Sequence, residues 1–304
     1  MGLARLRTAF PLGAPAWPDG VERPPVSRQV GLDYDTAWAR RYAARVARAV
    51  FVDDVLRPLV NVVGSPDVHG LDRLADLREP AIFAANHHSH LDTGVILTSL
   101  PERWRHKTVV AAASDTFFTT RAMSALSALT IGAIPIERHR VNRRSSDLVA
   151  ELLGEGWSLI IFPEGGRSPD GWARDFRGGA AYLAVKCDRP VVPVFLEGTR
   201  QVLKKGTTLP AGIANPFRRA GPVKVNFGKP LRPADGEDAR RFASRIERSI
   251  EELGDEWATN WWSARRRASA GTTPRLSGPP ASPWRRAWAL REGQRPAPGT
   301  TSWP

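Results

Sequence analysis

The sequence predicts an α/β fold in which a mostly parallel central sheet is flanked by helices. From about residue 80 onward, short apolar segments rich in β-formers alternate with segments of helical periodicity. Gly and Pro bound the apolar runs, which is typical of strands in a largely parallel sheet. The chain has 304 residues, 42% hydrophobic and 25% charged, which fits one or two globular domains.

The expected elements follow one another in a regular order. Strands are predicted at 81–85, 108–113, 131–136, 157–162, 191–196 and 223–227. Helices are predicted at about 93–100, 117–129, 143–153, 177–187 and 237–254. Pro193 lies inside an apolar run, which favours an edge strand or a local irregularity. In sheets of this kind, functional residues collect in the loops where strands end.

Residues 36–60 have the periodicity of a basic amphipathic helix. Five apolar residues share about a third of the helical circumference, and four arginines occupy the other side. Two interpretations remain open: the helix lies in a membrane interface, or it packs on the domain with its arginines in water. The apolar residues are Trp38, Tyr42, Val46, Ala49 and Val50, and the arginines are Arg40, Arg41, Arg45 and Arg48.

The two flanks carry most of the net charge of +13. From residue 261 onward eight Arg stand against one Glu, and twelve of the 26 prolines lie in residues 1–30 or after 260. Such flanks are predicted to be irregular. Six of the eleven Trp lie at or after residue 257, several beside arginine. This mixture suits an anionic membrane surface or packing against the domain, and nucleic-acid binding is the weakest of the three interpretations.

Several classes of protein are disfavoured by composition. A single cysteine, Cys187, excludes an internal disulfide and a cysteine-rich zinc site. No apolar run approaches the roughly 18 residues that span a bilayer, and residues 1–20 lack the continuous apolar region of a signal peptide. We therefore expect a soluble or surface-bound protein of a reducing compartment.

The sequence NHHSHLD, Asn86 to Asp92, directly follows the strand AIFAA. If Asp92 opens the next helix, its carboxylate can accept from one nitrogen of His87 and leave the other nitrogen as a base. This is the orienting half of a catalytic triad without a protein nucleophile, so the attacking hydroxyl would come from a substrate. Two alternatives are a metal site with His88 and His90, and a structural turn with solvated histidines.

A second motif, FPEGGRS, spans Phe162 to Ser168 and also follows an apolar strand. Its glycines allow backbone N–H groups to approach an anion, and Arg167 can pair with a phosphate. Glu164 can hold that arginine or accept from a ligand hydroxyl. The alternative is a Gly-rich surface turn with a solvated arginine. A third segment, IGAIPIER, ends a strand at Glu137–Arg138, which taken alone is a surface charge.

Together the motifs resemble the glycerolphosphate/lysophosphatidate acyltransferase family. That family carries, in order, an NH-x4-D block, a G-x3-[IF]-x-R block, an FPEGTRS-like block and a short Pro-centred apolar block. The order is kept here over residues 75–235, roughly half of the chain, and RGGAAYLAVK and FGKPL are also similar to the family. Gly166 stands where the family usually has Thr. The matching blocks are Asn86-His87…Asp92, Gly132…Arg138, Phe162…Ser168 and Val192-Pro193-Val194.

The resemblance implies a function and a site. His87 would deprotonate an acceptor hydroxyl with Asp92 orienting it, and the hydroxyl would attack the thioester of acyl-CoA or an acyl carrier protein. No metal or redox cofactor is implied. Lysophosphatidate is the first expected acceptor, before glycerol 3-phosphate and other lipids. The substrate-binding residues implied by the motif are Arg138, Glu164, Gly165, Arg167 and Ser168.

The resemblance also implies a domain organisation and a location. We expect a Pro-rich flank at 1–34, a basic amphipathic helix at 35–64 that docks on a membrane, an acyltransferase domain at 65–258 and an Arg/Trp/Pro-rich tail at 259–304. A lysophospholipid acceptor resides in the bilayer, so the expected location is cytoplasmic, peripheral on the inner face of the plasma membrane, with an anionic membrane surface as partner.

Two rival functions belong to other classes. A thioesterase or serine hydrolase would act on similar acyl substrates, but the elbow G-x-S-x-G is absent around Ser158 and Ser168. A basic membrane-binding or nucleic-acid-binding protein without catalysis is favoured by the charge alone. Acceptor-dependent release of a thiol separates the transferase from both rivals.

Overall fold

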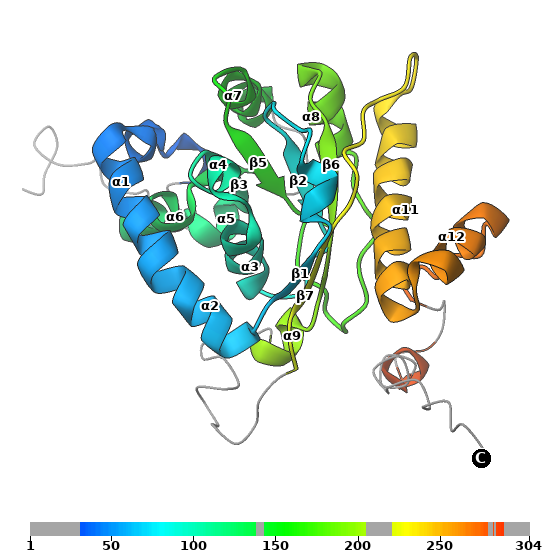
Figure 1. Cartoon of the computed structure of the whole chain (residues 1–304). Helices are drawn as coiled ribbons and strands as arrows, with labels where there is room; N and C mark the ends of the chain where they lie inside the picture. Colours follow the sequence, from blue (N-terminus) through cyan, green and yellow to red (C-terminus); the bar gives the residue numbers. More distant parts are fainter. Residues whose placement is uncertain (1–30, 138–142, 205–220, 279–281, 283, 289–304) are drawn as a thin grey trace, which may run out of the picture.

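The structure is a computed structural model that describes residues 31–137, 143–204, 221–278, 282 and 284–288. Within these residues the chain forms one seven-stranded sheet with the order β1-β7-β6-β2-β5-β3-β4 (Figure 1). Residues 1–30 of the expected flank 1–34 and much of the expected tail 259–304 lie outside the described residues. The strands are β1 Asp67–His69, β2 Ile82–Ala85, β3 Thr108–Ala113, β4 Ala133–Ile136, β5 Ser158–Ile161, β6 Val191–Glu197 and β7 Lys224–Phe227.

The sheet confirms the predicted mostly parallel α/β fold. Every strand pair is parallel except β6 with β7. All six predicted strands are present, and only the three-residue β1 was missed. The strand that contains Pro193 is interior, between β7 and β2, so the edge-strand interpretation is wrong. The irregularity lies opposite Pro193, where β7 has ended and the Gly228 N–H donates to the Pro193 carbonyl at 2.8 Å.

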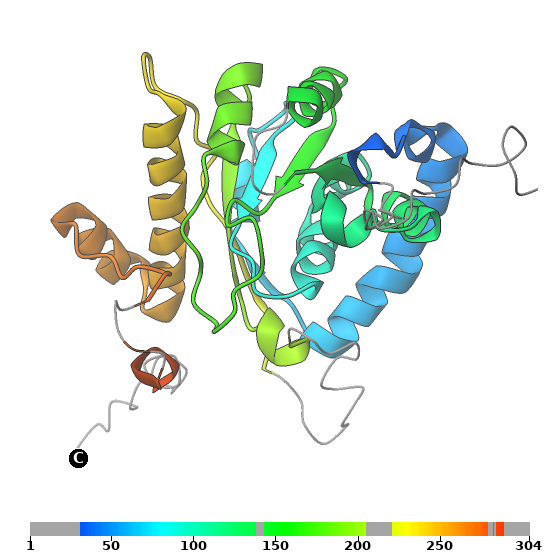
Figure 2. The same cartoon turned by 180° about the vertical axis from the view of Figure 1, so that it is seen from behind.

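Helices cover both faces of the sheet (Figure 2). One layer contains α2 and α3, and the other contains α7, α8 and α11. Shorter turns join these layers to the strands. The helices are α1 Tyr42–Val50, the π-helical segment η3 Phe51–Leu56, α2 Arg57–Gly64, α3 Leu91–Ser99, α4 Glu102–Arg105, α5 Ser114–Phe117, α6 Arg121–Ile131, α7 Arg143–Gly154, α8 Gly179–Cys187, α9 Thr199–Val202, α11 Ala239–Ala258 and α12 Trp261–Ala270.

The two-sided burial explains why the strands read as continuous apolar runs. Along β2, Phe83 and Ala85 face the core under α2 and α3, whereas Ile82 and Ala84 face the core under α8 and α11. All four are fully buried. Because successive side chains of a strand point to opposite faces, a strand covered on both sides needs apolar residues at every position.

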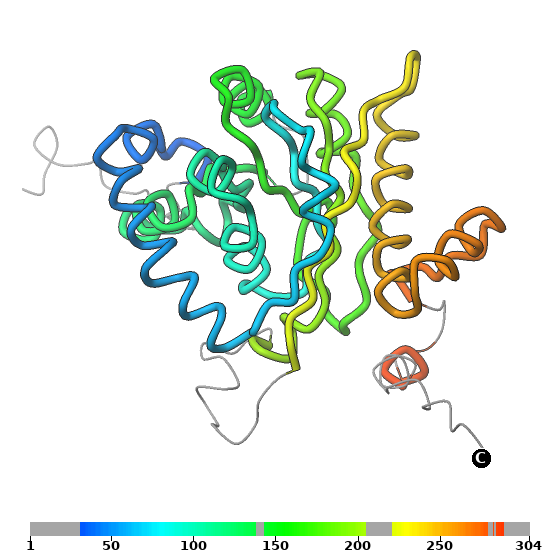
Figure 3. The backbone as a smooth tube through the Cα atoms, viewed as in Figure 1, coloured from blue at the N-terminus to red at the C-terminus, as the bar shows by residue number. Residues whose placement is uncertain are grey.

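Residues 42–64 form one continuous rod along the edge of the molecule (Figure 3). The rod packs one side into the core through residues such as Val52, Val60 and Val63. A second apolar row points away from the protein, which we call the outer stripe. The outer stripe consists of Tyr42, Val46, Val50, Val55, Leu59 and Val62, all exposed.

The π-helical turn keeps the outer stripe in line. At the end of this segment the Arg57 N–H bonds to the Val52 carbonyl, five residues back rather than four. The step from Val50 to Val55 is also five residues, whereas the steps on either side are four. The wider turn therefore returns Val55 to the same side of the rod as Val50.

The interpretation of this helix as packed with its arginines in water is wrong in one respect. Arg48 is only 4% exposed, and its guanidinium lies 5.6 Å from the centre of the Trp157 ring. Burial, followed by repulsion from Arg45 and Arg40, lowers the pKa of Arg48 to about 10. The helix thus buries one arginine and leaves an apolar row in water. Arg41 and Arg45 remain exposed beside that row.

Part of the tail that we expected to be irregular is helical. Asn260 caps α12 by accepting the Ser263 N–H at 2.9 Å, and α12 packs on α11. Trp261 and Trp262 are exposed at its start. Among the described helices, none combines the length and the apolar character that crossing a bilayer requires.

Candidate active site

The two loops that carry the NHHSHLD and FPEGGRS motifs meet because their strands are neighbours. β2 and β5 pair in parallel, so both end at the same edge of the sheet. The first loop runs from residue 86 to α3, and the second from residue 162 to α8. The Ser168 N–H donates to the His87 carbonyl at 2.9 Å, which joins the loops directly.

His87 and Asp92 form the pair that the motif predicts. The Nδ1 atom of His87 lies 2.8 Å from Oδ2 of Asp92. Asp92 lies in the first turn of α3 and is fully buried, and the same Oδ2 accepts the backbone N–H groups of His88 and Ser89 at 2.6 and 2.8 Å. Burial favours the neutral acid, but the hydrogen bond from His87, the nearby imidazoles and the Ser89 N–H together lower the pKa of Asp92.

The ring of His87 is held on its other side by Phe162. The two rings stack with centroids 4.1 Å apart and planes 22° apart. Only 15% of the His87 side chain is exposed, and that part lines a cavity. Because Nδ1 is engaged by Asp92, Nε2 is the nitrogen that a ligand in the cavity can use.

Asn86 fixes the point at which β2 ends. Its side-chain amide donates to the Leu196 carbonyl at 2.8 Å and its oxygen accepts the Leu196 N–H at 2.8 Å. The buried amide thus replaces one residue of the β2–β6 ladder. The chain then turns away from the sheet, so His87 directly follows the residue that makes this last contact with β6. We assigned Asn86 no role from the sequence, and its function here is structural.

Glu164 lies behind the cavity wall, 1% exposed, where it joins the two loops. Its Oε1 accepts the His87 N–H at 2.7 Å and its Oε2 accepts the Arg174 N–H at 2.9 Å. Burial raises the pKa of Glu164 to about 8, against the effect of these two donors. Its carboxyl group shapes the site through these hydrogen bonds, and Glu164 is not among the residues that line the cavity.

Gly165 has a conformation that favours glycine. Its φ is +67°, and a Cβ there would lie 3.1 Å from Nε of Arg177. The Arg177 N–H donates to the Pro163 carbonyl at 2.9 Å, so the end of the loop returns to its start. Sequence reasoning missed Arg174 and Arg177, although Arg177 opens the segment RGGAAYLAVK that drew attention for its resemblance.

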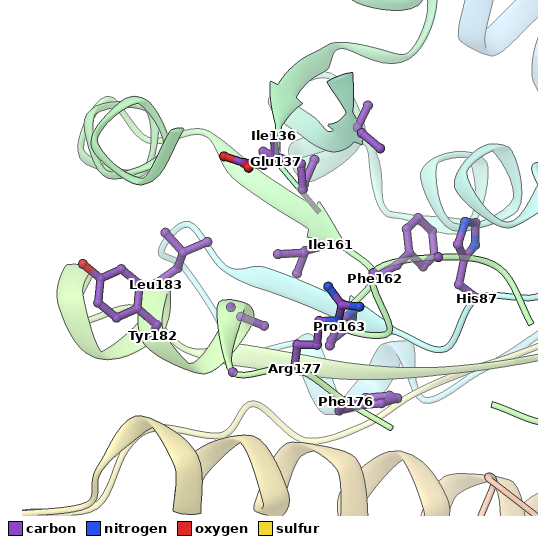
Figure 4. A pocket seen from close by; sticks show the side chains of 18 of the residues that line it. His87, Ile136, Glu137, Ile161, Phe162, Pro163, Phe176, Arg177, Tyr182 and Leu183 are labelled. Atoms are coloured by element: carbon purple, nitrogen blue, oxygen red, sulfur yellow. The ribbon is translucent and has the colours of Figure 1, made fainter. Parts of the chain in front are cut away.

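A cavity of about 810 Å³ opens beside His87 (Figure 4). His87 and Phe162 lie at one end, and Tyr182 and Leu183 lie at the other. Arginines from the loop after β5 and from α11 contribute to its wall, together with aliphatic side chains from the sheet, α7 and α8. The arginines are Arg167, Arg174, Arg177 and Arg240, and the aliphatic residues include Ile136, Val149, Ile161 and Leu183.

The remaining predicted residues occupy different places. Gly165 and Arg167 line the cavity. Ser168 is fully buried and accepts the Gly171 N–H at 2.7 Å, which makes it a loop-shaping residue here. Arg138 lies outside the described residues, and its neighbour Glu137 lines the cavity. Across the described ranges, no three His, Cys, Asp or Glu side chains gather as metal ligands would.

The central region of the chain is similar to known proteins. Residues 65–200 match the family model described as Acyltransferase. A 1-acyl-sn-glycerol-3-phosphate acyltransferase of Brassica napus is 31% identical over 167 residues, which cover 54% of this chain and 44% of that protein. The beta form of the same enzyme from Homo sapiens is 33% identical over 125 residues, covering 40% of this chain and 42% of that protein. The chain therefore spans less than half the length of these relatives.

A solved structure supports the fold. The crystal structure of the 1-acyl-sn-glycerophosphate acyltransferase PlsC from Thermotoga maritima superposes with a TM-score of 0.50. The match covers 74% of this chain and 85% of that one, at 24% sequence identity. This likeness confirms the predicted similarity in architecture, an α/β fold around a mostly parallel sheet.

Proposed function

We propose that the chain, whose residues 65–200 match the Acyltransferase family model, transfers a fatty acyl group to a hydroxyl of lysophosphatidate, forming phosphatidate. The observation that carries the proposal is the His87–Asp92 pair at one end of a cavity that is lined by both arginines and aliphatic residues. Named relatives of this region act, by their names, on 1-acylglycerol 3-phosphate.

The pair supplies general-base chemistry. Nε2 of His87 takes the proton of the acceptor hydroxyl as its oxygen attacks the thioester carbonyl, and Asp92 stabilises the imidazolium. The new bond joins the acceptor oxygen to the acyl carbon, and the bond between that carbon and sulfur breaks. The imidazolium then returns its proton to the leaving thiolate. Acyl-CoA or an acyl carrier protein is the donor, and no other cofactor enters.

The cavity suits the two parts of a lysophosphatidate-like acceptor. Arg167, Arg174 and Arg177 line the cavity from the loop that is hydrogen-bonded to His87, and there they would pair with a phosphate and hold the hydroxyl near Nε2. The aliphatic wall formed by residues such as Val149 and Leu183 would take an acyl chain. We keep Arg138 as a proposed further phosphate ligand from the family resemblance.

We also propose that the protein works at an anionic membrane surface. The outer stripe of the 42–64 rod places six apolar side chains in water, with Arg41 and Arg45 exposed beside it. An apolar row flanked by arginines is complementary to an interface of acyl chains and anionic headgroups. Exposed Trp262 and Trp284 in the tail are suited to headgroup level. Peripheral contact with the inner face of a plasma membrane is thus part of the proposal.

The direct test measures thiol release and lipid product together. The protein, in mild detergent, receives palmitoyl-CoA or acylated carrier protein with lysophosphatidate, glycerol 3-phosphate, lysophosphatidylcholine or no acceptor. We expect release only with an acceptor, fastest with lysophosphatidate, and an equal amount of phosphatidate. Thiol release without an acceptor would instead indicate a thioesterase. The absence of thiol release with every donor and acceptor would contradict the proposed transferase activity.

A further inference from the structure

The C-terminal part of the chain returns to the candidate site, although it lies outside the region that matches the family. After α12 the chain runs back along α11 toward the loop that precedes α8 (Figure 2). We call its described part, residues 271–278, 282 and 284–288, the C-terminal strap, and residues 163–178 the arginine loop. The arginine loop has no helix or strand of its own, so its conformation depends on outside contacts.

The strap holds the arginine loop through both backbone and side chains. The Ala173 N–H donates to the Leu276 carbonyl at 2.9 Å. The Trp172 indole N–H donates to the Arg286 carbonyl at 2.9 Å. The Nε atom of Arg286 lies 2.8 Å from Oδ2 of Asp170, and its Nη1 donates to the Ser277 carbonyl at 3.0 Å. Arg286 therefore connects the loop to two separate parts of the strap.

The Trp172 contact is shaped by a glycine. A Cβ on Gly278 would lie 2.4 Å from the Trp172 ring, and the φ of Gly278 is +73°. Only a residue without a side chain lets the strap backbone lie so close to the indole. Leu276 anchors the same stretch, because its side chain packs on the core and its N–H donates to Glu251 at 3.3 Å.

The inner side of the arginine loop faces the candidate site. Arg174, the residue after Ala173, donates its N–H to Glu164, which in turn accepts the N–H of His87. Arg174 and Arg177 line the cavity. Trp172 N–H also bonds to Oδ1 of Asp170 at 3.1 Å, so Asp170 organises the loop while it binds the strap. The strap thus bonds to Ala173, the residue directly before Arg174, which is one of the proposed phosphate-binding arginines.

We propose that Arg286, with its partner Asp170, is a positioning pair that sets the arginine loop for the acceptor phosphate. This inference rests on the proposed function, because it assigns the acceptor to that loop. Neither Arg286 nor Asp170 lines the cavity beside His87, so the pair acts on acceptor binding through the loop rather than on the chemical step. A phosphate-bearing acceptor is the ligand class whose affinity depends on it.

The test compares Arg286→Ala with a matched arginine variant. Arg232→Ala is the control, because Arg232 also forms ion pairs, with Asp188 at 3.3 Å and with Glu79, and neither partner belongs to the arginine loop. A short-chain 1-acylglycerol 3-phosphate that stays monomeric is the acceptor, which removes membrane binding from the measurement. We expect Arg286→Ala to raise the KM for the acceptor roughly threefold to fivefold, with kcat and the KM for acyl-CoA unchanged.

Two further measurements distinguish positioning from general loss of structure. In a double-mutant cycle, the variant that carries both Asp170→Ala and Arg286→Ala should have an acceptor KM no higher than that of the single variant with the larger effect. Gly278→Ala should increase hydrogen exchange in residues 169–177 and leave exchange in β2 and β5 unchanged. This exchange readout does not need enzymatic activity.

The possible outcomes distinguish a failure of the positioning role from a failure of the proposed acyltransferase function. If the wild type transfers acyl groups and Arg286→Ala keeps the acceptor KM of Arg232→Ala, the positioning role is overturned and the proposed function stands. Equal rises in the KM for acceptor and donor also overturn it, since they indicate a general structural effect. If the wild type itself transfers nothing, the proposed function fails and the positioning role fails with it.

Discussion

Glu164 accepts the backbone N–H of His87 at 2.7 Å from a position with 1% exposure. Through its other oxygen it holds Arg174, so a single buried carboxyl ties the base to the arginine loop. The proposed base and the proposed phosphate-binding loop are therefore not independent parts. We therefore expect a displacement of either loop to alter the hydrogen bonds that this carboxyl group makes to the other.

Replacing Asp92 with Asn should reduce the chemical step rather than binding. Asn keeps an oxygen near the His88 and Ser89 N–H groups, but it cannot stabilise an imidazolium with a negative charge. We expect kcat to fall about a hundredfold or more with a KM for acceptor within about threefold of wild type. Thiol-release kinetics measure both constants. A kcat equal to that of the wild type would show that Asp92 only supports the fold.

Glu164 should make the stability of the protein fall as the pH rises. Burial raises its folded-state pKa to about 8 from the ordinary 4.5, so between these values the folded state binds more protons than the unfolded state. The contribution of Glu164 to the free energy of unfolding is fully present below about pH 4.5 and is lost by about pH 8. Between these values the free energy of unfolding falls by up to about 1.4 kcal/mol per pH unit.

The comparison with Glu164→Gln isolates that contribution. Denaturant unfolding at several pH values between 5 and 9 gives the difference in unfolding free energy between the wild type and the variant. We expect this difference to shift against the wild type as pH rises, because Gln does not titrate. Groups such as Asp92 and His88 titrate in both proteins and cancel. A difference that is constant with pH would contradict the raised pKa.

A side chain at Gly165 should disturb the arginine loop. Gly165→Ala forces a φ near +67° on alanine and brings Cβ against Arg177, at an expected cost of roughly 1–2 kcal/mol. We expect a higher KM for the acceptor and a lower melting temperature. Gly154→Ala is the control, since a Cβ there meets nothing within 4 Å. Equal behaviour of the two variants would show that the loop tolerates another conformation.

The outer stripe should govern binding to vesicles. Val46→Ser with Val50→Ser removes two exposed apolar groups, and co-sedimentation with phosphatidylglycerol vesicles should weaken at least about fivefold. Val185→Ser is the control, because Val185 is exposed to a similar degree, 43% against 45% for Val46, on the opposite helix layer. Activity on a monomeric acceptor should stay unchanged in both proteins. Equal binding of all three proteins would exclude the stripe as the docking surface.

The fold could be predicted because strands that are buried on both faces have a recognisable apolar sequence pattern. Strands such as β2 are covered on both faces, so each reads as an uninterrupted apolar run between breakers. The three-residue β1 could not be found, since Asp67 and His69 are exposed on an edge strand and show no pattern. Strand order depends on tertiary crossovers and has no local signal, which is why the interior place of Pro193 was missed.

The motifs of the candidate site could be predicted from the sequence, but the role of each residue within them could not. His87 and Asp92 follow from local geometry at the start of a helix. Whether Glu164 faces the cavity or a backbone amide depends on how a long loop folds back, and no spacing encodes that. The strap contact of Arg286 with Asp170 joins residues 116 positions apart, beyond the reach of pattern analysis.

The most direct test of His87 as the base compares two histidines that each contact an aspartate. His87 contacts Asp92 beside the cavity, and His69 contacts Asp67 at 3.0 Å on the outer strand β1, outside the cavity lining. Phosphatidate formation from lysophosphatidate and palmitoyl-CoA is measured for the wild type, His87→Ala and His69→Ala at equal amounts of folded protein. The account predicts that His87→Ala loses at least about a hundredfold of the rate while His69→Ala keeps it. Wild-type rates in both variants would contradict the account.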